Sequence, residues 1–202
     1  MSGKPIPLIL PTHPKPKPKP KPKQKMTVIA PSTSIYPIPI PKVSKSVEAY
    51  IIQEYLELKK FMHEGIKIQE LLHSTNPLFI TIIGPPLSLY EGEEYELMII
   101  YDDSYPNKPP LIQFVPGKTP PHEHIFHNGH ICLSSLYHCG WTTLSKSKEI
   151  HVGLLRACID IIRLLSQSKK KAWPWNDERY CRIAPSDPRM TSFEYGEAAS
   201  PS

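Results

Sequence analysis

The sequence contains no apolar run long enough to cross a membrane and little that points to secretion. Its longest apolar stretches are interrupted by charge within about ten positions, whereas a spanning helix needs roughly 20 apolar residues. The N terminus has no apolar segment followed by a cleavage site, so we expect no signal peptide. There is no Cys-x-x-Cys pair among the four cysteines, Cys132, Cys139, Cys158 and Cys181. These absences predict a soluble protein of the cytoplasm or nucleus, with reduced thiols.

Acidic residues are absent from the first 46 positions, which contain nine lysines. The whole chain has a formal charge of +5, so the remaining residues, with 15 basic and 19 acidic side chains, carry −4. Twelve of the 25 prolines fall within residues 1–44. Because such a segment has few backbone donors and repels itself, we predict that residues 1–44 form a disordered, extended basic tail. The tail is either a solubilising tether or an electrostatic arm for acidic protein surfaces, anionic membrane or nucleic acid.

With 202 residues, 40% of them hydrophobic, the chain has material for one domain plus tails. A first helix is predicted to begin at Ser46, as its cap, and to end by Gly65, with an apolar face of Val47, Ile51, Tyr55, Leu58 and Met62. Its opposite face should meet water through Glu48, Glu54, Glu57, Lys59 and Lys60. A second helix should begin at Ser147, with an apolar stripe of Leu155, Cys158, Ile159, Ile162 and Leu165.

Four short β-type runs lie between these helices, over residues 66–72, 78–83, 95–101 and 111–115. Gly, Pro, Asn or Asp separates them, and such tight spacing predicts an antiparallel meander. The order helix, four strands, loop, helix predicts an α+β domain over residues 45–182. Residues 183–202 are polar and rich in Pro, Ser and Gly, so we predict a flexible C-terminal tail.

The stretch after Val115 and through Leu144 is irregular and contains five histidines and two cysteines. Loops of this length inside a compact domain are usually functional. A zinc site could use the histidines with Cys132 and Cys139, but the spacing His-x-His-x-x-His-x-x-His-x-Cys matches no standard structural site. A Cys–His hydrolase would need a base and an oxyanion hole, and no local protease signature is present. A buried, chemically silent Cys132 is the third alternative.

The segment from His122 to Leu133 resembles the active-site strip of ubiquitin-conjugating enzymes, His-Pro-Asn-Ile-x-x-x-Gly-x-Ile-Cys-Leu. The positions that agree are His122, Ile125, Gly129, Ile131, Cys132 and Leu133. The segment Tyr105–Pro110 resembles the family's Tyr-Pro-Phe-x-x-Pro, and Tyr90–Glu93 resembles its Tyr-Glu-Gly-Gly. Trp141 stands nine residues after the cysteine, where the family also has tryptophan.

This resemblance implies the ubiquitin-conjugating enzyme fold, no cofactor, and Cys132 as the thioester-forming nucleophile. His124 stands where most members have asparagine, so it would either hydrogen-bond the developing oxyanion or pack the loop. The residues expected to support the loop are His122, Asn128, Gly129, Trp141 and Tyr105. We expect His127 and His130 to be solvated, the alternative being that they tune the pKa of Cys132.

Residues 128–134 are most similar to the W-type members, which modify protein N termini. Ser134 replaces an acid common in the family two residues beyond the nucleophile. The candidates for orienting an incoming amine are therefore Asp177, Asn176 and Ser134, although a helix cap before Tyr180 would equally explain Asp177. The resemblance favours transfer of ubiquitin to a protein amine, and the W-type likeness favours the N-terminal α-amine.

The partners implied are ubiquitin, its activating enzyme, protein substrates and a RING or U-box ligase. The expected ligase-docking residues are Pro106, Asn107, Thr142 and Thr143. They are atypical, because Asn107 replaces the family's phenylalanine and Thr142-Thr143-Leu144 replaces its Ser-Pro-Ala. Two alternatives remain open from the residues: conjugation of another ubiquitin-like modifier, and a drifted, non-catalytic binding variant of the fold.

Overall fold

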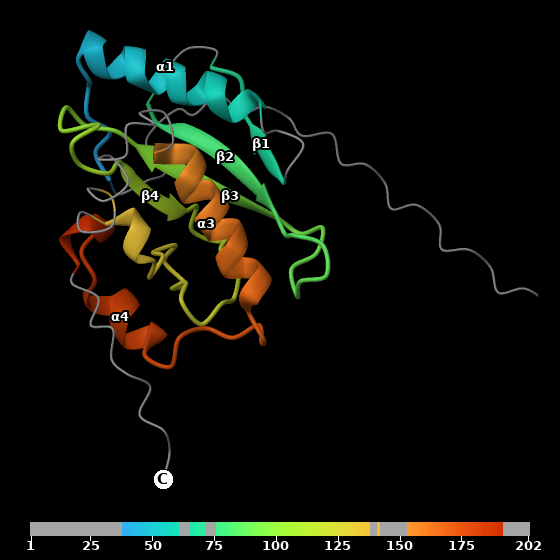
Figure 1. The fold of residues 1–202 in the computed structure, drawn as a ribbon. Coiled ribbons are helices and arrows are strands. Elements are labelled where there is room, and N and C mark those ends of the chain that lie inside the picture. Colours follow the sequence, from blue (N-terminus) through green and yellow to red (C-terminus); the bar gives the residue numbers. More distant parts are fainter. Residues whose placement is uncertain (1–37, 61–64, 72–75, 138–140, 142–152, 192–202) are drawn as a thin grey trace, which may run out of the picture. The chain divides into compact units, whose positions relative to one another are not determined.

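The computed structural model describes residues 38–60, 65–71, 76–137, 141 and 153–191, all within one compact unit, Tyr36–Ser202. Its elements are α1 (Lys45–Lys60), β1 (Ile66–Ile68), β2 (Leu78–Ile83), β3 (Glu94–Ile100), β4 (Leu111–Phe114), η1 (Ser134–Leu136), α3 (Gly153–Gln167), α4 (Asp177–Ile183) and η2 (Pro188–Met190). This order confirms the predicted α+β class (Figure 1). The predictions for residues 1–37 and for a helix start at Ser147 lie outside the described residues. None of the described helices is long and apolar enough to span a bilayer.

The four strands form one antiparallel sheet in the order β1-β2-β3-β4, which confirms the predicted meander. β1 is shorter than predicted and ends at Ile68. Because side chains alternate between the two faces of a strand, Leu97 and Ile99 of β3 point to one face while Met98 and Ile100 point to the other. The sheet therefore has two apolar faces, and each needs a cover.

Helices α1 and α3 cover the inner face of the sheet (Figure 1). The predicted stripe of α1 is buried there through Val47, Ile51, Tyr55 and Leu58, whereas Met62 lies outside the described residues. α3 adds Leu154, Leu155, Ala157, Cys158, Ile161 and Leu165 to the same cluster. Burying one Leu or Ile side chain stabilises a fold by roughly 1.5–3 kcal/mol, so this cluster dominates the apolar stabilisation.

The start of α1 and one of its side chains differ from the prediction. The helix begins at Lys45, so Ser46 lies inside it, and the Glu48 amide bonds the Ser44 carbonyl at 3.0 Å. Glu54, predicted to face water, is 6% exposed. Its carboxylate accepts a hydrogen bond from the Tyr105 hydroxyl at 2.5 Å and one from the Leu154 amide at 3.2 Å. These contacts explain how an acid can lie within the core.

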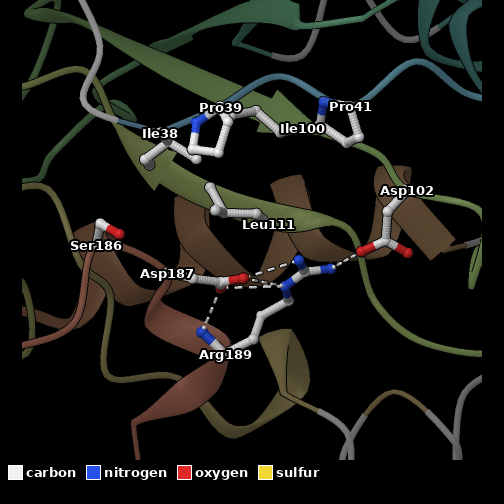
Figure 2. A pocket seen from close by; sticks show the side chains of 9 residues that line it. All are labelled: Ile38, Pro39, Pro41, Ile100, Asp102, Leu111, Ser186, Asp187 and Arg189. Atoms are coloured by element: carbon white, nitrogen blue, oxygen red, sulfur yellow. Dashed lines mark hydrogen bonds and ion pairs between the residues drawn. The ribbon is translucent and has the colours of Figure 1, made fainter.

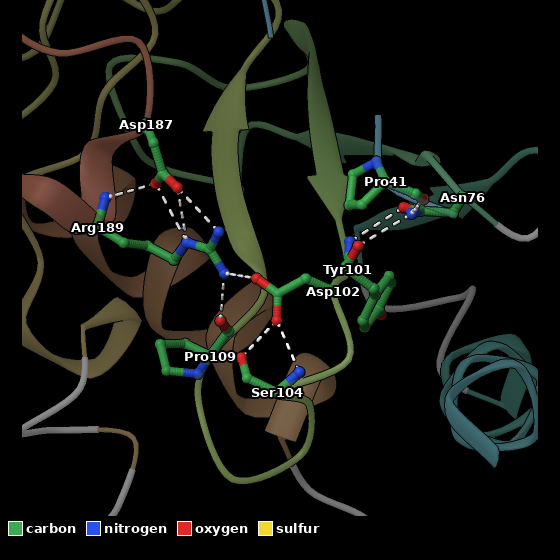
Figure 3. A network of polar contacts seen from close by, with 8 residues as sticks. All are labelled: Pro41, Asn76, Tyr101, Asp102, Ser104, Pro109, Asp187 and Arg189. Atoms are coloured by element: carbon green, nitrogen blue, oxygen red, sulfur yellow. Dashed lines mark hydrogen bonds and ion pairs between the residues drawn. The ribbon is translucent and has the colours of Figure 1, made fainter. Parts of the chain in front are cut away.

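The sequence predicts that residues 38–44 belong to the N-terminal tail. In the structure they instead cover part of the outer face of the sheet. Ile38 is 7% exposed and packs with Met98, Ile100, Leu111 and Val115. The Asn76 side chain holds this segment, because it donates to the Pro41 carbonyl at 3.0 Å and also bonds the Tyr101 backbone (Figure 3). The folded unit therefore begins before α1.

The prediction of a flexible tail over residues 183–202 is wrong for residues 183–191, and residues 192–202 lie outside the described residues. This segment contains η2, and Pro188 is buried. Its Arg189 pairs with Asp187 at 2.8 Å and with Asp102, just beyond β3, at 2.7 Å (Figure 3). The sequence prediction failed because polar composition was taken as a sign of solvation, whereas here charged groups satisfy one another.

Candidate active site

The segment from His122 to Leu133 folds back on itself and lies against the end of β4. Isolated bridges pair His122 with Ile125 and Ile125 with Ile131, and the Phe126 amide bonds the His130 carbonyl at 2.8 Å. Ile125 and Ile131 are both fully buried. The chain thus forms a tight, two-sided loop whose apolar residues are anchored in the main core.

Gly129 is required at the tip of this loop. Its φ of +94° lies in the left-handed region, and a Cβ atom there would stand 2.1 Å from the Phe114 carbonyl oxygen. The close approach lets the Phe114 amide donate to the Gly129 carbonyl at 2.9 Å. The loop is therefore fastened to β4. Asn128 supports the same turn, since its side-chain oxygen accepts from the His130 amide at 3.2 Å.

Cys132 is half-buried at the end of the loop, and its amide donates to the His124 carbonyl at 2.8 Å. Burial raises the pKa of its thiol. Among the residues that the structure describes, no imidazole bonds its sulfur. Cys158, by contrast, is fully buried in α3, where burial raises its pKa to about 12.

His122 and His124 belong to the same loop as Cys132 but lie in different environments. His122 is buried, its Nδ1 accepts from the His124 amide at 2.9 Å, and its Nε2 lies 3.2 Å from the Leu164 carbonyl. Burial lowers the pKa of His122, which fits a neutral ring that accepts at one nitrogen and donates at the other. The side chain of His124 is exposed, with its ring 5.7 Å from that of His122. His122 thus fixes the backbone to which the Cys132 amide is bonded.

His130 is buried, which corrects the prediction that it would be solvated; His127 is exposed as predicted. Burial lowers the pKa of His130 to about 4, although a backbone hydrogen bond to Ser186 and the charge of Asp187 oppose the shift. Its Nδ1 lies 2.9 Å from the hydroxyl of Tyr180 in α4. The Tyr180 ring also stacks on Phe126, with centroids 3.7 Å apart. The sequence reasoning missed this packing because it depends on contacts between distant segments.

Helix α4 also holds the loop through Asp177. The Asp177 carboxylate accepts from the His127 amide at 2.8 Å, and Cys181 lies 3.5 Å from the same oxygen. Asn176 occupies the N-cap position without a side-chain capping bond. Ser134 is exposed at the start of η1. Of the three candidates for orienting an amine, Asp177 is therefore already engaged with the loop backbone.

Tyr105 and Trp141 link the expected docking loop to the core. Both are buried, with ring centroids 6.2 Å apart, and the Trp141 indole donates to the Pro106 carbonyl at 3.1 Å. Pro106 is half-buried and Asn107 is exposed next to it. The other two expected docking residues, Thr142 and Thr143, lie outside the described residues.

The histidine cluster does not converge on a metal position in the described part of the chain, where no group of three His, Cys, Asp or Glu side chains could hold an ion. His122 and His130 are buried with protein partners, whereas His124 and His127 are exposed. Cys139, which the zinc alternative also needed, lies outside that part.

Comparison with known proteins identifies the class to which this fold and loop belong. The family profile described as "Ubiquitin-conjugating enzyme" matches residues 50–190, well over half of the chain. The chain therefore belongs to the ubiquitin-conjugating enzyme family, as its active-site strip had indicated.

Within this family the chain is similar to W-type members. It is 30% identical over 153 residues to "Ubiquitin-conjugating enzyme E2 W" of Caenorhabditis elegans, covering 75% of this chain and 95% of that protein. It is 28% identical over 152 residues to "Probable ubiquitin-conjugating enzyme E2 W-A" of Danio rerio, covering 74% and 95%. The crystal structure of the ubiquitin-conjugating enzyme UbcA1 from Agrocybe aegerita superimposes with a TM-score of 0.58 at 30% identity, covering 70% of this chain and 96% of that one. The predicted family and the W-type likeness are confirmed.

Proposed function

We propose that Cys132 carries ubiquitin as a thioester and passes it to a protein amine, the N-terminal α-amine included. In the first step the Cys132 thiolate attacks the thioester between ubiquitin and the activating enzyme, and the activating enzyme's thiolate leaves. In the second step an amine attacks the new thioester, the Cys132 thiolate leaves, and the nitrogen loses a proton to solvent. A thiol suits both steps, since it is a good nucleophile and a good leaving group.

The observation that carries the proposal is the position of Cys132. It is half-buried directly after the tight Gly129 turn, with its backbone anchored to His124, inside the region that the family profile matches.

The α-amine is favoured by acid–base chemistry. At neutral pH an α-amino group with a pKa near 7.7–8.0 is roughly 10–20% neutral, whereas lysine, near 10.4, is well under about 0.1% neutral. A site that serves lysine therefore needs an acid free to orient or deprotonate it. Here Ser134 stands where an acid is common, and the Asp177 carboxylate is bonded to the His127 amide at 2.8 Å. Such a site suits an α-amine, which depends less than lysine does on an acid to orient or deprotonate it.

The charging step can be tested directly. Wild-type protein should form a reductant-sensitive adduct with ubiquitin and its activating enzyme, while Cys132→Ser should give at most a reductant-resistant oxyester. Cys158→Ser and Cys181→Ser should still charge. Charging that survives Cys132→Ala would overturn the proposal, and charging only by a different modifier would favour the alternative that the chain conjugates another ubiquitin-like protein.

The acceptor is tested by discharge of the preformed thioester. Three nucleophiles should be compared: free lysine, a lysine-free peptide with an open N terminus, and the same peptide N-acetylated. We expect fast discharge onto the open peptide only. Rapid discharge onto lysine, with the open and acetylated peptides equivalent, would place the enzyme in the lysine-directed class.

The partners of this function are ubiquitin, its activating enzyme, protein substrates and a RING or U-box ligase that accepts the atypical docking residues. Asn107 is exposed where the family has an aromatic anchor, whose loss can cost about 2 kcal/mol or more of binding energy. We therefore expect weak stimulation by generic RING domains.

A further inference from the structure

Arg189 joins two loops that are far apart in the sequence. Its guanidinium bonds Asp102 at 2.7 Å and the Pro109 carbonyl at 3.1 Å. In the sequence these two partners flank Pro106 and Asn107, two of the expected docking residues. It also bonds both oxygens of Asp187, at 2.8–3.2 Å. Figure 3 shows the guanidinium between the two carboxylates, and Figure 2 shows the same group at the edge of a hollow beneath Ile38. The C-terminal segment is thereby fixed against the loop that follows β3.

The same C-terminal segment reaches the active-site loop. His130, two residues before Cys132, forms a hydrogen bond to the Ser186 backbone and lies within the electrostatic range of Asp187. The His130 carbonyl in turn accepts from the Phe126 amide at 2.8 Å. Hydrogen bonds therefore join Asp102, Arg189 and Asp187, and the backbone of Ser186, the residue before Asp187, bonds His130.

The geometry points to Arg189 as a positioning residue: we propose that it holds residues 184–191 as a strut between the 101–109 loop and the Cys132 loop, and so sets the geometry in which the thioester is attacked. This inference rests on the proposed function of Cys132. Arg189 touches neither Cys132 nor an acceptor, so it acts through His130 and the loop backbone.

The chemistry of Arg189 suits this role better than that of an ordinary surface ion pair. Its side chain is 24% exposed, and its partners Asp102 and Asp187 are 31% and 27% exposed. Although partial burial opposes ionisation, hydrogen bonds from Ser104 and Arg189 lower the pKa of Asp102. A planar guanidinium can bond two carboxylates and a carbonyl together, whereas the point charge of lysine cannot reproduce this fork.

The test compares the full-length wild type with Arg189→Met, Arg189→Lys and the control Arg163→Met, which removes an exposed α3 arginine paired with Asp160 at 3.2 Å. Charging with ubiquitin is measured first, then discharge onto the open peptide over a range of peptide concentrations. We expect Arg189→Met to charge normally and to discharge with a kcat about three- to thirtyfold lower at unchanged KM, the range typical of coupling residues remote from a site. Arg189→Lys should recover part of the rate, and Arg163→Met should match wild type.

An NMR titration of the His130 ring supplies a readout that lost stability alone would not move. The wild-type midpoint should lie near 4, and in Arg189→Met it should rise toward the ordinary value of about 6.5 as the strut releases His130 to water. Asp102→Asn, which keeps the side-chain shape, gives a second variant, and its effect on kcat should not add to that of Arg189→Met. Wild-type discharge and an unmoved His130 midpoint in charged Arg189→Met would overturn the strut, whereas absence of charging in the wild type would overturn the proposed function instead.

Discussion

At the scale of single residues, the most informative side chain is the acid within the core. Glu54 lies three residues after Ile51 and next to Tyr55, so helical periodicity places it on the apolar face of α1. The spacing of Glu54 therefore contains this signal, although its acidic side chain alone predicts the solvated face. Its carboxylate bonds Tyr105 at 2.5 Å and the Leu154 amide at 3.2 Å, and so connects α1, the loop before β4 and the start of α3.

Glu54→Ala should lower the free energy of unfolding by about 3 kcal/mol, because it leaves the Tyr105 hydroxyl and the Leu154 amide without this partner inside the core. Urea unfolding followed by circular dichroism measures the change. The matched control is Glu57→Ala on the exposed side of the same helix, where only a surface pair with Lys60 at 2.6 Å is lost and the cost should stay below about 1 kcal/mol. Equal losses in the two variants would contradict a core role for Glu54.

His130 gives the fold a specific dependence on pH. Its folded pKa of about 4 lies below the unfolded value of about 6.5, so between these values the unfolded chain binds more protons than the folded one. Stability contributed by the neutral ring is thus present above about pH 6.5 and is lost as the pH falls toward 4. At pH 4.5 the loss relative to pH 7 should be about 2 kcal/mol.

His130→Asn should remove this part of the pH dependence, so the difference in unfolding free energy between pH 7 and pH 4.5 should be smaller by about 2 kcal/mol than in the wild type. His127→Asn is the control, since His127 is exposed in the same loop. A His130→Asn protein whose stability follows the wild-type pH profile would show that the ring titrates normally in the folded state.

At the scale of elements, the sequence predicted the helices and strands whose apolar residues recur at regular intervals. Both core helices and all four strands followed from apolar spacing, because each buries a regular stripe or alternating face. The segments 38–44 and 184–191 have no such pattern. Their order comes from single contacts with distant residues, such as Asn76 with Pro41 and Arg189 with Asp102. The same limit applied to the site: the resemblance of residues 122–133 to a family strip predicted the roles of Cys132 and Gly129, but the sequence could not show that Tyr180 of α4 bonds His130.

The docking of α4 on the loop makes a prediction about Asp177 that separates two roles. As an anchor for the His127 amide, Asp177 needs only an acceptor oxygen, which asparagine also supplies. Asp177→Asn should therefore discharge at close to the wild-type rate, while Asp177→Ala should be slower by about tenfold or less. If Asp177 instead orients or deprotonates the amine, both variants should lose activity together. Discharge of the charged enzyme onto the open peptide decides between them.

At the scale of the whole molecule, the sheet is covered on both faces by different means. The inner face is covered by α1 and α3, whereas part of the outer face is covered by Ile38 in the segment that precedes α1. The sequence predicts that the lysine- and proline-rich stretch before this segment adds nothing to the core. The boundary between tail and folded unit should therefore lie close to Ile38, well before the residue 44 that composition alone had indicated.

Deletion of residues 1–37 should leave the free energy of unfolding within about 0.5 kcal/mol of the full-length value and should not impair charging of Cys132. Deletion of residues 1–41 should cost about 2–3 kcal/mol more, because it exposes the apolar surface of Met98, Ile100 and Leu111 and removes the Pro41 carbonyl that Asn76 bonds at 3.0 Å.

Two point variants of the full-length chain separate burial from chain length. Ile38→Ser, where the side chain is 7% exposed, should be destabilised, and Ile40→Ser, at 41% exposed, should not. If deletion of residues 1–37 were as costly as the longer deletion, the basic stretch would be part of the folded unit and the boundary would have to move toward the N terminus. If instead neither deletion had an effect, the outer face of the sheet would be stable without its cover, and the packing of Ile38 would contribute nothing to the fold.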